Sequence, residues 1–364
     1  MKNLFLVIPT IRQGGGAARV MLNLLNNLDR LKYKITLVVN VLETENMPIL
    51  PIDVEIIELG FKKSRFAILS FCRVVYREKP DVVFSTMGHL NILIAAFRWA
   101  LPARTTFIAR ETNTVSVKNK HTPYPRLFDL MYRLFYNNFD KIVAQSNFMK
   151  MDLVDNYETQ KDKIVVINNP IDTKSIDQNI VNSSGRETNI VRDTTTLNLI
   201  AVGRLSHQKG YDLLCQVLAL LDINFHLDIY GTGPDLAQLV DIVKDLGLTN
   251  KVSFMGYTEN PYEKIVRSDL LLLSSRYEGF PNVVLEANYC GVPVVGFDSP
   301  GGTAEIIKNG LNGFLVAYED YYGFAEMIKG AAKSDFDPCE IKKFTKQKYG
   351  LETILREYEL LFDD

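Results

Sequence analysis

The chain has 364 residues, of which 47% are hydrophobic and 23% are charged, and its formal net charge is −2. This composition is that of an ordinary globular protein, and the length favours two domains over one. A nearly neutral chain lacks the overall basic character with which nucleic-acid-binding proteins meet phosphates, so we predict no nucleic-acid partner.

Cysteines and apolar runs exclude several protein classes. The four cysteines are scattered and form no Cys-x-x-Cys pair, which favours free thiols over disulfides or a metal site. The apolar run at 4–8 is too short for a signal peptide and is interpreted as a first strand. The longest other run, 90–97, falls short of the roughly 18–20 residues that a membrane span needs. We predict a protein that is cytoplasmic or lies on a membrane, without crossing one.

In the first half of the chain, short β-branched runs alternate with helical patterns. Strands are predicted at 4–8, 35–41, 81–85, 105–109, 141–144 and 165–167. Helices are predicted near 17–30, 65–79, 89–100, 125–138 and 147–157. Strands that alternate with helices indicate a parallel, doubly wound sheet.

The pattern stops and then starts again. Residues 173–196 are polar and lack periodicity, which is typical of a linker or a loose loop. Further strands are predicted at 199–202, 225–230, 252–255, 270–273, 292–296 and 314–316, and further helices near 210–221, 235–246, 261–267, 282–290 and 302–308. Two similar α/β domains joined by a linker form a cleft, and open α/β sheets bind ligands at the carboxyl ends of their strands.

A glycine-rich loop follows the first strand. Its Gly14-x-Gly16 is a poor dinucleotide motif, because Arg19 stands where a third glycine belongs and the next strand ends in Asn40 rather than in an acid. Two interpretations stay open. The loop is a simple tight turn, or Gly15 and Gly16 let a phosphate or sugar approach the backbone.

A basic loop at 203–210 lies between a predicted strand and a predicted helix. It begins with Gly203 and carries two cations, Arg204 and Lys209. Arginine binds phosphate with a planar fork and lysine acts as a point charge, so together they suit a diphosphate. An isolated Arg and Lys would by default be solvated surface residues, but the strand-loop-helix context favours a binding site.

Two glutamates surround the start of another predicted helix. Glu278 follows the strand at 270–273, Pro281 suits the first helical turn, and Glu286 lies about two turns further on. Helix starts present backbone N–H groups to anions. The predicted binding stretch is Gly279, Phe280, Pro281, Asn282 and Val283. A nucleotide-sugar could reach both acids; the alternative, a hydrolase acid/base pair, fits the basic loop less well.

Together these motifs resemble those of the retaining glycosyltransferases of GT-B architecture, in particular family 4 (glycosyl transferases group 1). That family carries two glutamates separated by seven residues, as Glu278 and Glu286 are here, with Gly-Phe-Pro after the first and a basic loop upstream. The resemblance is dense in the second half of the chain and loose in the first. It implies two Rossmann-like domains facing a cleft: 1–172 on the acceptor side and 197–347 on the donor side. Residues 173–196 would link them, and a last helix at about 348–364 would pack back on the first domain.

The resemblance also implies roles for the site residues. Arg204 and Lys209 would hold the diphosphate, Glu278 would lie near the transferred sugar, and Glu286 would bind the ribose hydroxyls. Many members carry a histidine after the fifth strand, and this chain has Glu111 in that region. Glu111 would orient a sugar hydroxyl, accept the acceptor's proton, or only cap the following loop.

The implied activity is transfer of a hexosyl or N-acetylhexosaminyl group from a nucleotide-diphosphate sugar, with UDP favoured as the nucleotide. The acceptor would be a glycan or polyprenyl-linked glycan, in cell-surface polysaccharide or glycoconjugate synthesis. Neither a metal nor a cofactor is expected, and the one Asp-x-Asp, at 335–337, is interpreted as surface. A nucleotide-sugar epimerase and a non-catalytic sugar-nucleotide-binding subunit are the alternatives.

Basic and aromatic residues are mixed in the first half, at 62–77, 98–99 and 124–136. Such mixtures suit the anionic surface of a membrane. They equally suit helices with one core face and one solvated face. Lipid-linked acceptors in the resembling family favour peripheral contact with the inner face of the membrane.

Overall fold

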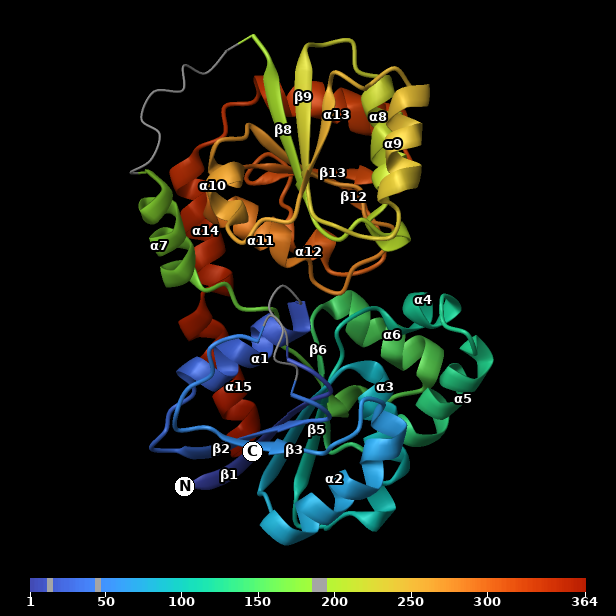
Figure 1. Ribbon diagram of the computed structural model, residues 1–364, viewed down its shortest axis with the longest axis vertical. Coiled ribbons are helices and arrows are strands. Elements are labelled where there is room, and N and C mark those ends of the chain that lie inside the picture. The colour runs from blue at the N-terminus through green and yellow to red at the C-terminus, as the bar shows by residue number, and fades with distance from the viewer. Residues whose placement is uncertain (12–15, 43–46, 185–194) are drawn as a thin grey trace. The chain divides into compact units, whose positions relative to one another are not determined.

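The computed structural model describes residues 1–11, 16–42, 47–184 and 195–364 (Figure 1). The chain forms two compact units. Unit 1 comprises residues 1–170 and 351–364, and unit 2 comprises residues 171–350. Each unit is one parallel β-sheet with helices on its faces, which confirms the predicted α/β class.

Unit 1 has a seven-stranded sheet with the order β3-β2-β1-β4-β5-β6-β7, and every neighbouring pair is parallel. The strands are β1 (Lys2–Ile8), β2 (Tyr33–Val39), β3 (Glu55–Glu58), β4 (Val82–Thr86), β5 (Thr106–Arg110), β6 (Lys141–Ala144) and β7 (Ile164–Val166). The helices are α1 (Gly16–Asn27), α2 (Ser64–Glu78), α3 (Gly88–Ala96), α4 (Val115–Lys120), α5 (Pro125–Phe135), α6 (Asn147–Tyr157) and α15 (Leu351–Asp363). The six predicted strands are confirmed, and β3 and α4 are additional.

Both faces of the unit 1 sheet are buried. Phe5 and Val7 of β1 face a cluster that includes residues of α2, α3, α5 and α6. Leu4, Leu6 and Ile8 face the other cluster, which includes residues of α1 and α15. Successive side chains of a strand point to opposite faces, so a strand buried on both faces is apolar throughout. This is why the first strand could be predicted from a continuous run.

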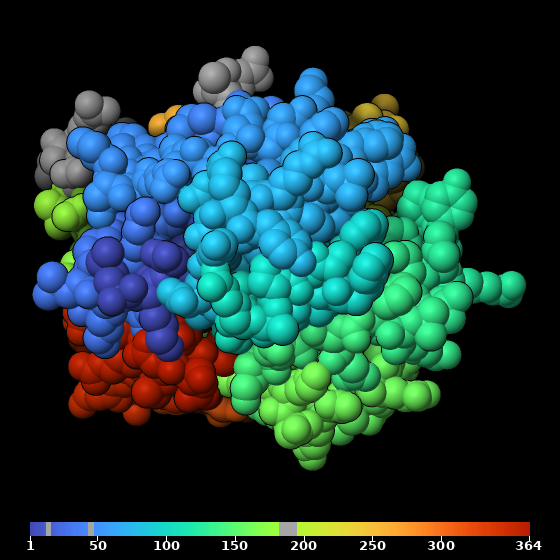
Figure 2. Space-filling model, turned by 90° about the horizontal axis from the view of Figure 1, so that it is seen from below, coloured from blue at the N-terminus to red at the C-terminus, as the bar shows by residue number. Residues whose placement is uncertain are grey.

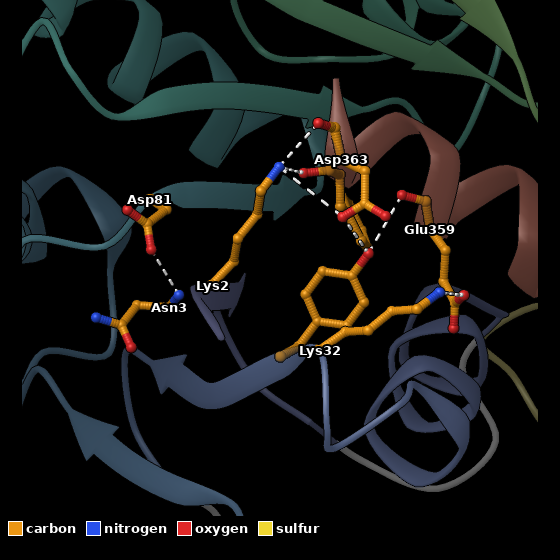
Figure 3. Close-up of polar contacts among 8 residues, drawn as sticks. Lys2, Asn3, Lys32, Asp81, Glu359 and Asp363 are labelled. Carbon is orange, nitrogen blue, oxygen red and sulfur yellow. Dashed lines mark hydrogen bonds and ion pairs between the residues drawn. The ribbon is translucent and has the colours of Figure 1, made fainter.

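The last helix, α15, lies on the same sheet face as α1. Tyr358 and Phe362 are buried there against Phe84 of β4. Figure 3 shows the polar contacts at the end of α15: Lys2 Nζ donates to the Phe362 carbonyl at 3.0 Å, and Lys32 Nζ pairs with Glu359 at 2.9 Å. Figure 2 shows α15 in red beside the start of β1 in dark blue. The C-terminus is therefore tied to the first strand.

Unit 2 has a six-stranded parallel sheet with the order β10-β9-β8-β11-β12-β13. The strands are β8 (Leu197–Val202), β9 (Phe225–Tyr230), β10 (Val252–Gly256), β11 (Leu270–Leu273), β12 (Val294–Asp298) and β13 (Gly313–Ala317). The helices are α7 (Thr173–Ser184), α8 (Tyr211–Ala219), α9 (Leu236–Asp245), α10 (Pro261–Val266), α11 (Asn282–Tyr289), α12 (Thr303–Ile306), α13 (Tyr321–Lys333) and α14 (Pro338–Tyr349). The predicted strands are confirmed, and α13 and α14 are additional.

The start of the expected linker is a helix, which corrects the expectation of a loose loop from residue 173. Asp172 caps α7, because its Oδ1 accepts a hydrogen bond from the Ser175 N–H at 3.0 Å. Ile176 is buried in the core of unit 2, and Asp177 accepts a hydrogen bond from Tyr289 at 2.7 Å. These tertiary contacts outweigh the weak helix propensity of Asn, Ser and Thr. Residues 185–194 lie outside the described part of the chain.

Within the described ranges, no helix combines the length and the apolar content that crossing a bilayer requires.

Candidate active site

The two predicted motifs of unit 2 meet at Glu278. This residue lies in the loop after β11, and only 6% of it is exposed. Its Oε1 accepts hydrogen bonds from Lys209 Nζ and from Ser275 Oγ, both at 2.6 Å. Lys209 and Glu278 are thus an ion pair formed by two loops that are far apart in the sequence. The sequence predicted each residue separately and did not predict the pair.

Close backbone approach at this place depends on two glycines. Gly210 ends the basic loop with φ +62°, and a Cβ there would lie 2.2 Å from the Ser274 carbonyl oxygen. Gly301 has φ +138°, and a Cβ there would lie 2.2 Å from the Glu278 carbonyl oxygen. Only glycine fits either position. The loops at 203–210 and 299–303 therefore both rest on the segment that carries Glu278.

The other predicted cation, Arg204, is exposed. Its guanidinium makes no hydrogen bond or ion pair to any residue in the described ranges, whereas the neighbouring Leu205 is buried in the core. Gly203 donates its N–H to the Tyr230 carbonyl at 2.9 Å, which continues the strand pairing of β8 with β9. The backbone of the loop is held by the sheet while the Arg204 side chain remains available to an anion.

The second glutamate, Glu286, lies in α11 and is 6% exposed. The residues of the predicted binding stretch, 279–283, differ in their burial and contacts. Phe280 packs on Tyr349 with ring centroids 5.5 Å apart, and the Gly279 carbonyl accepts a hydrogen bond from the Gly302 N–H at 2.8 Å. Pro281 is buried, and Asn282 and Val283 at the start of α11 are half-buried. The Phe280 side chain therefore belongs to the core, and contact with a ligand would involve its backbone.

The glycine-rich loop is described only in part. Gly15 lies outside the described residues. Gly16 is the first residue of α1 and is exposed.

Glu111 follows β5 in unit 1 and is 1% exposed. Its Oε1 accepts hydrogen bonds from Asn91 Nδ2 and Tyr132 OH, each at 3.2 Å, and from Tyr136 OH. Burial raises the pKa of the Glu111 carboxyl group above its ordinary value, although these hydrogen bonds lower it. The residue that the sequence placed on the acceptor side is therefore enclosed by α3 and α5 of its own unit.

Three residues around Glu278 and Lys209 were not predicted from the sequence: Ser275, Arg276 and Asp212. Ser275 is 1% exposed and binds Glu278, while Arg276 forms an ion pair with Asp212 at 2.6 Å. Ser275 and Arg276 lie within three residues of Glu278 in the sequence, so their position was a usable signal. The partner of Arg276 could not be read from the sequence, because it lies 64 residues away.

No group of three or more His, Cys, Asp or Glu side chains in the described ranges could hold a metal ion. In the Asp-x-Asp sequence, Asp337 caps α14 by accepting a hydrogen bond from the Cys339 N–H at 2.8 Å.

Two family models match the chain, and together they span most of it. The model described as glycosyl transferases group 1 matches residues 188–348. The model described as Glycosyltransferase Family 4 matches residues 14–175. The chain belongs to glycosyltransferase family 4. The resemblance stated from the motifs is confirmed for both halves of this glycosyltransferase.

Two curated relatives illustrate the similarity of this glycosyltransferase to others. A Campylobacter jejuni N-acetylgalactosamine-N,N'-diacetylbacillosaminyl-diphospho-undecaprenol 4-alpha-N-acetylgalactosaminyltransferase is 26% identical over 291 residues, which cover 80% of this chain and 76% of the relative. The lipopolysaccharide 1,6-galactosyltransferase of Escherichia coli K12 is 25% identical, with 80% of this chain and 79% of the relative covered.

Solved structures confirm the GT-B fold. The lipopolysaccharide outer core galactosyltransferase WaaB, in its apo form, superposes with a TM-score of 0.76 at 20% identity, covering 99% of this chain and 98% of that one. Anabaena Alr3699/HepE in complex with UDP has the same TM-score at 19% identity, covering 100% of each chain.

Proposed function

We propose that this family 4 enzyme transfers a hexosyl or N-acetylhexosaminyl group from a UDP-sugar to a glycan or polyprenyl-linked glycan, with retention of the anomeric configuration. The observation that carries the proposal is the Lys209–Glu278 ion pair at the end of β11. It puts a cation, which suits a phosphate, beside a buried carboxylate, which suits a sugar hydroxyl. The names of relatives that act on a lipid diphosphate or on lipopolysaccharide support the acceptor class.

In the proposed mechanism, Lys209 and Arg204 bind the donor diphosphate, and Glu286 binds the ribose hydroxyls. The bond between the anomeric carbon and the phosphate oxygen breaks, and its electron pair stays on that oxygen. The acceptor hydroxyl forms the new bond on the same face of the sugar and gives its proton to the leaving phosphate. The two cations stabilise the negative charge that grows on the phosphate. Because they supply this charge, we propose that transfer needs no metal ion.

A donor panel tests this function. Saturation-transfer NMR with UDP-, GDP- and ADP-sugars, in the presence of EDTA, is expected to show binding of one donor. Glu286→Ala removes hydrogen bonds from a carboxylate and is expected to weaken that binding by about 10–100-fold. Glu326→Ala, which changes an exposed glutamate of α13, is the matched control and should bind like the wild type.

Three outcomes would contradict the proposal. Binding of none of the donors would favour a non-catalytic subunit. A bound donor that isomerises without any acceptor would favour an epimerase. Binding that requires a divalent metal would overturn metal independence.

We also propose that the enzyme works at the inner face of the membrane and that α5 contacts anionic lipid. Leu127, Leu130 and Leu134 recur at helical spacing and are 53%, 52% and 60% exposed. They form an apolar stripe beside the one that faces the core, and Arg126 and Arg133 next to it are exposed. Helices with this arrangement bind anionic interfaces. Helix α2 of the same unit also exposes apolar and basic side chains. Residues of α2 and α5 are both visible on the surface of unit 1 that Figure 2 shows.

Vesicle sedimentation tests the membrane contact. The wild type is expected to sediment with phosphatidylglycerol vesicles and not with phosphatidylcholine vesicles, because binding combines apolar burial with attraction to anionic lipid. The variant with Leu127→Gln, Leu130→Gln and Leu134→Gln should lose most of this binding. A control with Leu236→Gln, Val240→Gln and Leu246→Gln changes three exposed apolar residues at α9 and should bind normally. Equal sedimentation of both variants would refute the role of α5.

A further inference from the structure

The segment that carries Lys209 is held by two residues that lie just after β11, Ser274 and Arg276. This segment is a short 3-10 turn, His207–Lys209. The His207 carbonyl accepts a hydrogen bond from Arg276 Nη1 at 2.8 Å, and the Gln208 carbonyl accepts one from the Arg276 N–H at 2.8 Å. The Lys209 carbonyl accepts one from Ser274 Oγ at 3.0 Å. All three carbonyls of the turn are therefore bound from one side.

Arg276 joins this turn to the helix that follows it. Its Nη1 and Nη2 donate to Asp212 Oδ1 and Oδ2 at 2.8 and 2.6 Å, a bidentate pair. Asp212 lies in the first turn of α8, where a negative charge is also favoured by the helix dipole. Burial raises the pKa of the Asp212 carboxyl group, but the hydrogen bonds from Arg276 outweigh burial and hold this pKa below its ordinary value. Asp212 is therefore ionised at neutral pH.

The ion pair with Asp212 determines whether the Arg276 guanidinium can bind a ligand. The guanidinium side chain is 16% exposed and its fork is occupied by a carboxylate. Both terminal nitrogens of Arg276 donate to Asp212, and Nη1 also donates to the His207 carbonyl, so the hydrogen bonds of this guanidinium are used within the protein. Arg276 is thus unlike Arg204, whose guanidinium is exposed, although both are cations on loops of the same site.

We propose that Arg276, with Asp212 as its counter-ion, is a positioning residue that sets where the Lys209 ammonium meets Glu278 and the donor diphosphate. The proposal rests on the function proposed above for Lys209 and Glu278. Arg276 acts on the backbone of His207 and Gln208, so it determines the direction in which the next side chain leaves the turn. Displacing a charged catalytic group by about 1 Å can lower a rate by about 10²-fold.

Arg276→Lys keeps the positive charge and loses the fork, so it separates geometry from charge. We expect UDP to bind about 10-fold more weakly to this variant, because Lys209 no longer meets the diphosphate well. We expect UMP to bind as it does to the wild type, because it lacks the second phosphate. General damage to the fold would weaken both nucleotides equally, and that result would overturn the proposal.

Asp212→Asn should reproduce the effect of Arg276→Lys, and the double variant should be no worse than either single one, because both changes break the same contact. Lys329→Met is the matched control. It breaks the ion pair of Lys329 with Asp222, which lies just beyond the other end of α8, and should leave UDP binding unchanged.

A crystal structure of the full-length Arg276→Lys variant tests the positioning role of Arg276 separately from the proposed transferase function. We expect Lys209 Nζ to leave hydrogen-bond distance of Glu278 Oε1. A contact retained at its present 2.6 Å would overturn the positioning role. If the wild type binds neither UDP nor any other donor, the proposed function fails, and this distance still tests the role of Arg276.

Discussion

Replacing Lys209 by methionine is expected to lower the rate of sugar transfer by about 10²–10³-fold, the loss typical when one group that stabilises developing negative charge is removed. The lysine Nζ lies 2.6 Å from Glu278 Oε1, at the place where the donor diphosphate and sugar would meet. Methionine keeps much of the side-chain volume and removes the charge. Steady-state transfer from the donor found in the NMR panel measures the effect.

This substitution also removes the cation from a buried carboxylate, because Glu278 is 6% exposed. Leaving one partner of a buried ion pair alone costs about 3 kcal/mol or more. The double variant Lys209→Met with Glu278→Gln removes both charges and should recover most of the stability in a denaturant titration. It should recover no transfer activity. If activity returned together with stability, the ion pair would be structural and the proposed catalytic roles would be wrong.

Replacing Glu111 by alanine is expected to give the largest loss of stability. Its carboxyl group accepts hydrogen bonds from Tyr132 and Tyr136, both almost fully buried. Each buried hydroxyl left without its acceptor costs about 1–3 kcal/mol. Glu111→Gln keeps an oxygen in the same place and should be much milder. Guanidinium unfolding of the three proteins measures the difference, and an alanine variant as stable as the wild type would contradict it.

The same residue predicts a pH dependence. Burial raises the pKa of folded Glu111 above its ordinary value of 4.5, so the folded protein keeps a proton that the unfolded chain has lost. Stability therefore falls as pH rises from 4.5 to the raised pKa, and then levels off. Glutamine has no such proton. As pH rises from 4.5 to the raised pKa, Glu111→Gln should gain stability relative to the wild type. A difference that does not change with pH would contradict the raised pKa, and full sugar transfer by this variant would show that Glu111 is not a catalytic base.

The motifs of unit 2 could be predicted because their chemistry is local. Glu278 and the basic loop each follow a predicted strand, and Glu286 lies in the predicted helix after Glu278. Parallel strands bring their carboxyl ends to one edge of the sheet. Periodicity likewise predicted both sheets, since strands buried on two faces are continuously apolar. The short strand β3 was missed because its Glu55 and Glu58 interrupt such a run.

The polar segment after residue 172 shows where local pattern fails. Its Asn, Ser and Thr residues favour a loop, but α7 buries Ile176 and ties Asp177 to Tyr289 and Lys342. None of these partners is near in sequence. Propensity is a weak preference that a few tertiary contacts override.

The sequence by itself determined the class of the fold, the family and the residue types available to bind a diphosphate and a sugar. Only the tertiary structure decided which charges are paired. In it, Lys209 forms an ion pair with Glu278 and Arg276 forms one with Asp212, whereas Arg204 is exposed. Glu111 is buried and accepts hydrogen bonds from two tyrosines. The physical reason is that burial and pairing depend on side chains that meet across the sheet edge or between helices, often many residues apart. A local pattern shows which charged side chains are present, but it does not show which of them are paired with an opposite charge.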